Sequence, residues 1–127
     1  MTARQTFSSG QVLTAAQMNA VAEANLAVNA QGTATSYTLA LTDAGKLITF
    51  TGAAATVTIP TNASVALAVG DQINIAQLGT AQITIGTASG VTLVSSGSKT
   101  KTNGQYAVAT VVQYTANSWL LLGNIST

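Results

Sequence analysis

The stretch "QINIAQLGTAQITIG" (residues 72–86) alternates apolar and polar side chains with a period of two. Ile73 and Ile75 share one face of its first half, and Ile83 and Ile85 share one face of its second half. This alternation is typical of β-strands that bury one face. The link "LGTA" between the halves contains a glycine, as hairpin loops commonly do, so the stretch predicts two consecutive antiparallel strands.

The same alternation continues through most of the chain. The segments "YTLALT", "LITFT", "TVTIP", "VTLVS", "QYAVATVVQYT" and "WLLLGNI" indicate further strands, separated by turns rich in Gly, Asn and Ser. The triplets "INI", "ITI" and "VTL" also suggest β-helix coils, but they are spaced too closely for the ~20-residue coils of solenoids. About eight short strands with no helix between them favour a sandwich. We therefore expect a mainly β protein, with an antiparallel β-sandwich or jelly-roll-like domain over residues 32–127.

An extended arm and one N-terminal α-helix are expected to precede this domain, over residues 1–31. Thr14 has the features of an N-cap, and Gln17 completes a T-x-x-Q capping box. Leu13 and Met18 flank the cap at the positions of a hydrophobic staple. The alanine-rich segment that follows should remain helical to about Asn29.

One face of this helix carries a row of residues at heptad-like spacing: Met18, Val21, Asn25 and Val28. A helix of this length is marginal alone in water, so it needs a partner surface. Either it packs on its own β domain, or copies of the helix pack around an axis with Asn25 setting the register. In the arm, Phe7, Val12 and Leu13 are apolar residues without a strand partner in the sequence, a pattern shared by arms that dock through a few anchors and by ordinary frayed termini. We expect these three residues to be attachment anchors.

The composition points to a surface covered by other subunits. Only 6% of the 127 residues are charged and the formal net charge is +1, whereas an average domain has about 25% charged residues. Large uncharged surfaces commonly mark interfaces, although neutral Thr/Ser faces can also be tolerated in solvent. Neither the net charge nor the hydropathy pattern favours nucleic acid or a membrane as a partner.

Catalytic chemistry has little support in the sequence. The chain has no His and no Cys, which excludes imidazole or thiolate nucleophile systems and the metal ligands they supply. Asp43 and Asp71 stand where aspartate caps a turn. Lys99 and Lys101 lie in a polar loop. We therefore expect a non-enzymatic protein without a cofactor or metal.

The segment "TFSSGQVLTAAQMNAV" (6–21) resembles the N-terminal segment of many bacteriophage virion proteins, which follows the pattern F-x-x-G-x-x-L-T-A-A-x-x-N. The matching residues are Phe7, Gly10, Leu13, Thr14, Ala15, Ala16 and Asn19. The later segments "DAGKLITFTGAAATVTIP" and "VGDQINIAQLGTAQITI" look like a β domain found in such proteins. Relatives of this kind are structural parts and often trimers.

The resemblance implies a structural virion part that is a homotrimer, and it leaves open which part of the particle this is. A chain made of an anchor and a β domain, without the shaft sequence of a long fibre, favours a capsid-decorating (cement) protein, whose partners are its own copies and the major capsid protein or other virion proteins. It would be assembled in the host cytoplasm, since the first ten residues lack the apolar stretch of a signal peptide. The alternative is a small tail-fibre or baseplate component with a receptor- or glycan-binding β domain. Trp119, Tyr114 and Tyr106 are the aromatic candidates for such binding.

Overall fold

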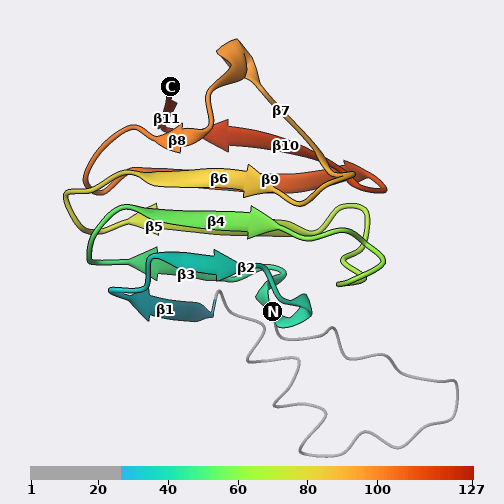
Figure 1. Ribbon diagram of the computed structural model, residues 1–127, viewed down its shortest axis with the longest axis horizontal. Coiled ribbons are helices and arrows are strands. Elements are labelled where there is room, and N and C mark those ends of the chain that lie inside the picture. Colours follow the sequence, from blue (N-terminus) through green and yellow to red (C-terminus); the bar gives the residue numbers. More distant parts are fainter. Residues whose placement is uncertain (1–26) are drawn as a thin grey trace, which may run out of the picture.

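Residues 27–127 are described by a computed structural model, in which eleven strands form two sheets packed face to face (Figure 1). The strands are β1 (Val28–Gly32), β2 (Ser36–Thr38), β3 (Leu47–Phe50), β4 (Ala55–Ile59), β5 (Gln72–Gln77), β6 (Ile83–Thr87), β7 (Thr92–Ser95), β8 (Lys101–Thr102), β9 (Val108–Thr115), β10 (Ser118–Gly123) and β11 (Ile125–Ser126). Two short 3-10 helices, η1 (Leu41–Asp43) and η2 (Ser96–Ser98), lie in the connections. The mainly β class expected from the sequence is confirmed.

The first six strands form a coil in which the chain passes alternately from one sheet to the other. Sheet A has the order β1-β3-β5-β9-β10-β7, and sheet B has the order β11-β8-β6-β4-β2. The pairs β1–β3, β3–β5, β2–β4 and β4–β6 are all parallel. Consecutive strands therefore alternate between the sheets and form three stacked rungs: β1–β2, β3–β4 and β5–β6.

The expectation of an antiparallel domain is wrong, because both sheets are mixed. β5 and β6 do not form a hairpin: they belong to opposite sheets. Ile73 and Ile75 lie on β5, Ile83 and Ile85 lie on β6, and all four are buried in the core as predicted. Their alternation correctly identified two strands with one buried face, but it holds equally for strands that face each other across a core and for strands side by side.

The corners after the sheet A strands explain why the coil can form. A Cβ added to Gly79 would lie 2.7 Å from the carbonyl oxygen of Thr51, and one added to Gly52 would lie 2.8 Å from Cα of Thr33. Successive corners therefore approach so closely that only glycine fits. The "LGTA" link, predicted to be a hairpin loop, is one of these corners.

The C-terminal strands close the coil with antiparallel pairs. β9 pairs with β5 on one side and with β10 on the other, and β8 pairs with β6. The strands expected at "QYAVATVVQYT" and "WLLLGNI" are β9 and β10, which form a hairpin, and Asn117 in its turn has a positive φ of 57°. β7 then adds to β10 in parallel.

The core lies between the two sheets. Trp119 from β10 and Phe50 from β3 are its largest side chains, and both are fully buried. Two buried polar residues are also bonded: the Thr102 hydroxyl donates to Gln77 Oε1 over 2.6 Å and accepts from the Ile83 N–H over 2.9 Å. These bonds satisfy groups that would otherwise be costly to bury.

The end of the predicted helix is wrong. Val28 and Asn29 belong to β1, where the backbone joins β3 and Asn29 bonds Asp43, rather than to a helix that continues to Asn29. β1 also crosses the expected boundary between residues 31 and 32. The other predicted seam and anchor residues lie outside the described residues: Phe7, Val12, Leu13, Met18, Val21 and Asn25.

Candidate functional site

The Asp43 carboxylate is the centre of a polar cluster in the first rung. It is almost fully buried and accepts hydrogen bonds from the Tyr37 hydroxyl, from Asn29 Nδ2 over 2.9 Å and from the Ala40 N–H over 2.8 Å. Burial, followed by the hydrogen bond to Asp43 and its charge, raises the pKa of Tyr37 to about 12. The carboxylate thus joins β1, β2 and the η1 turn.

Among the other described charges, Lys46, Asp71 and Lys99 lie in connections between strands, whereas Lys101 lies in a strand. Asp71 Oδ2 accepts from the Ala68 N–H over 2.8 Å in the turn before β5, so both aspartates hold turn backbone as the sequence predicted. Lys99 is exposed in the connection after η2, and Lys101 is half-buried in β8. Within residues 27–127, no cluster of His, Cys, Asp or Glu has the size needed to hold a metal ion.

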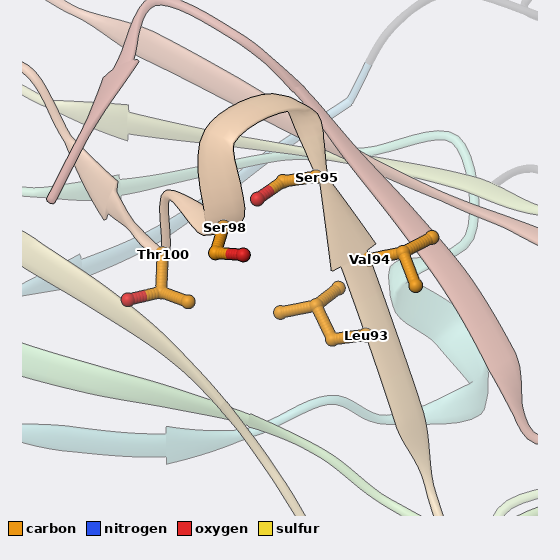
Figure 2. A pocket seen from close by; sticks show the side chains of 5 residues that line it. All are labelled: Leu93, Val94, Ser95, Ser98 and Thr100. Carbon is orange, nitrogen blue, oxygen red and sulfur yellow. The ribbon is translucent and has the colours of Figure 1, made fainter.

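A pocket of about 180 Å³ lies where the chain leaves β7. Figure 2 shows its lining, with Leu93 and Val94 on opposite sides of the strand and hydroxyl groups from the η2 connection nearby. The lining residues are Leu93, Val94, Ser95, Ser98 and Thr100. Ser95 Oγ donates to the Lys99 carbonyl within this connection. The pocket therefore combines hydroxyl and aliphatic groups without a charged lining residue.

The three aromatic candidates for ligand binding do not form one site. Trp119 is fully buried, which removes it as a surface for stacking a sugar. Tyr106 is 72% exposed just before β9, and Tyr114 is 50% exposed near the end of that strand. A strand of eight residues is about 25 Å long, so the two tyrosines lie at opposite ends.

The outer face of sheet B carries hydroxyl groups. Thr56 and Thr58 on β4 alternate with buried Val57 and Ile59, and Thr84 lies beside Thr56 in the next strand. Lys101 follows in the same row, opposite Thr84. Polar side chains on the outer face and apolar side chains on the inner face are usual for a sheet with one solvated face.

The outer face of sheet A carries large apolar side chains on β7, β9 and β10, with Thr92 and Thr110 among them. Its large side chains are each between 41% and 50% exposed, apart from the half-buried Val112. We call these six residues the apolar face: Val94, Val108, Val112, Tyr114, Leu120 and Leu122. Across the strands, Leu120 is paired with Val94 on one side and with Val112 on the other. The apolar face is thus continuous over three strands.

Sequence reasoning missed this surface, although a signal was present. In "AVATVVQY" and "WLLLG", apolar residues occupy both alternating positions rather than one. Strands that are apolar on both faces are typical of sheets covered on both sides. Val28 is the predicted site residue that falls within the described chain. It is 60% exposed on β1, and β3 and β5 separate it from β9.

No protein-family model and no curated protein matches this chain. Within residues 27–127, no helix has the length and apolar character needed to cross a membrane. Three features of the described residues remain to be explained: a buried polar cluster, a small uncharged pocket and an exposed apolar face.

Proposed function

We propose that this protein is a non-enzymatic structural component of a bacteriophage virion. It acts as a homotrimeric capsid-decorating protein that stabilises the shell through its N-terminal arm. The resemblance of residues 6–21 to virion leaders supports the phage origin. A structural role is supported by the two described carboxylates, since Asp43 and Asp71 both accept backbone N–H groups that hold turns.

The observation that carries the proposal is the apolar face on sheet A. Six large apolar side chains adjoin one another on an outer sheet surface, and exposed apolar surface of this kind usually marks a site of association. Sheet B, by contrast, has the hydroxyl-rich outer surface of a solvated sheet. A protein with one face suited to solvent and one suited to contact fits an assembly component.

A small tail-fibre or baseplate component with a binding β domain is the second candidate. The observation that favours it is the exposure of Tyr106, whose positive φ of 69° is unusual for a residue with a side chain. Unusual backbone conformations cluster at binding sites. A glycan array probed with the wild-type protein and with Tyr106→Ala tests this role. Binding that requires Tyr106 would establish it, and an empty array would remove it.

Deletion of residues 1–13 tests the role of the arm. The truncated protein is expected to keep its β-sheet circular dichroism and its thermal unfolding transition, because β1 begins at Val28. It is also expected to lose its attachment to purified particles, since Phe7, Val12 and Leu13 are the proposed anchors. Imaging of labelled particles shows the location. Copies confined to the tail would refute the capsid assignment, and attachment of the truncated protein would refute the role of the arm.

A further inference from the structure

We propose that the apolar face of β7, β9 and β10 is the surface on which a second copy of this chain packs. This inference rests on the proposed association of copies and names the surface that they share. In the proposed homotrimer, the sheet A surfaces of the copies would be directed toward their common axis, and the sheet B surfaces would be directed outward.

The first argument is the pattern of side chains across the face. Val94, Leu120 and Val112 form one row over three neighbouring strands. Val108 lies opposite Ala76 of β5, which is buried, so the exposed apolar side chains are confined to β7, β9 and β10. Rows of aliphatic side chains interdigitate when two sheets pack about 10 Å apart. The face therefore has the form of an inner sandwich surface that lacks its covering layer within residues 27–127.

The second argument is charge, which selects a second copy as the occupant. Among the described residues, no strand of sheet A contains a charged side chain. Lys46 and Asp71 precede β3 and β5 at one end of the sheet, and Lys99 lies in the connection after β7, where its carbonyl accepts from Ser95. A charged partner would lose hydration here and gain no opposite charge in return. Another copy of the same chain presents an equally neutral surface.

Three polar residues of β5 and β9 next to the apolar side chains are bonded to one another or to the backbone. Thr110 Oγ1 donates to Asn74 Oδ1 over 2.8 Å, and Gln72 Nε2 donates to the same oxygen over 3.3 Å. Asn74 Nδ2 in turn donates to the Lys46 carbonyl over 3.4 Å. Polar groups that bond one another lose less when water is removed from them. This part of sheet A can therefore be covered by a partner that offers few hydrogen bonds.

The area of the sheet is sufficient for association. Six strands about 4.8 Å apart, each about five residues long at about 3.3 Å per residue, give sheet A an outer surface of about 500 Å², of which the three strands of the apolar face make up about half. Two such surfaces in contact bury about 1,000 Å², which reaches the lower bound for a specific interface. Flanking loops that contain Val69 and Leu78, both exposed, would add to this area.

Lysine substitutions test the surface. Leu120→Lys and Leu122→Lys place a charge on the apolar face, and Thr56→Lys and Thr84→Lys are matched controls on the outer face of sheet B. Light scattering of the full-length chain at micromolar concentration gives the mass. We expect both leucine variants to raise the apparent Kd of association at least about 100-fold, as expected for an uncompensated buried charge. We expect both threonine variants to keep the wild-type mass.

A second measurement keeps the test valid if a lysine variant fails to fold. The chain has no cysteine, so Leu120→Cys and Thr56→Cys each introduce a single labelling site. In the wild-type-like oligomer, Leu120→Cys should react with a maleimide at least about tenfold more slowly than Thr56→Cys. Equal labelling rates, or leucine variants with the wild-type mass, would overturn the proposed surface while leaving association intact. A monomeric wild-type protein would instead refute the homotrimer itself.

Discussion

Replacement of Asp43 by alanine should lower the free energy of unfolding of the domain more than its conservative replacement by asparagine. The carboxylate accepts hydrogen bonds from Tyr37, Asn29 and the Ala40 backbone, and it is 1% exposed. Asp43→Ala leaves all three donors without this acceptor. Asp43→Asn is the matched control, because it keeps the size of the side chain and one carbonyl oxygen.

The magnitude follows from the three donors. A buried donor left without its acceptor costs about 1–3 kcal/mol. Tyr37, Asn29 and Ala40 are only partly buried, so water can reach them and the lower end of that range applies. Three donors at about 1 kcal/mol each give about 3 kcal/mol for Asp43→Ala. For Asp43→Asn we expect about half of this loss, because the carbonyl oxygen still accepts from at least one donor.

Urea unfolding followed by tryptophan fluorescence measures this loss. Trp119 is the only tryptophan and is fully buried, so its emission reports the folded core. With a slope of about 1.5 kcal/mol per M, a loss of 3 kcal/mol lowers the midpoint by about 2 M. Hydrogen exchange of the Leu39 amide, which donates to the Thr58 carbonyl, reports the first rung separately. If Asp43→Ala changes neither the midpoint nor this exchange rate, the cluster does not stabilise the rung.

Two further predictions concern pH and backbone geometry. The pKa of Tyr37 in the folded chain is raised to about 12, whereas an unfolded tyrosine ionises near pH 10. As the pH rises, the unfolded chain therefore releases this proton first. The contribution of protonated Tyr37 to the stability of the fold is complete below pH 10 and is lost as the pH rises toward 12. Urea midpoints at pH 9 and 11.5 should fall less in Tyr37→Phe than in the wild type, and an equal fall would contradict this linkage. Gly123 has a φ of 112°, and an added Cβ would lie 2.5 Å from the Val108 carbonyl oxygen, so Gly123→Ala should cost at least about 2 kcal/mol. Gly104→Ala is the control, because no atom lies within 4 Å of the added Cβ. Its free energy of unfolding should stay within about 0.5 kcal/mol of the wild-type value in the same assay. Similar losses in the two variants would show that the close approach at Gly123 is unimportant.

Sequence reasoning identified strands and their buried faces better than it identified their partners. The burial of Ile73, Ile75, Ile83 and Ile85 is confirmed, because a period of two depends only on local geometry. Pairing depends on the path of the chain after each strand. At the "LGTA" link this path is fixed by the contact of Gly79 with a corner formed by an earlier segment. Such a long-range contact has no local signature.

The candidate surface was hidden from sequence reasoning for a related reason. Leu120 and Leu121 are adjacent in sequence, yet Leu121 is 1% exposed in the core and Leu120 lies on the apolar face. A run of three leucines does not show which side chains a second layer covers. Similarly, Trp119 was considered as a ligand-stacking residue because composition alone does not separate a core tryptophan from an exposed one.

The position of β9 between β5 and β10 affects how the chain can fold during its synthesis. The coil of β1 to β6 is translated first, but β5 keeps an unpaired edge until β9 has left the ribosome. β7 must likewise wait for β10, which follows it by more than twenty residues in the sequence. Nascent chains that stall before residue 108 would therefore expose sheet edges prone to joining other chains. Synthesis of the last two strands of sheet A is thus the step that ends this exposure.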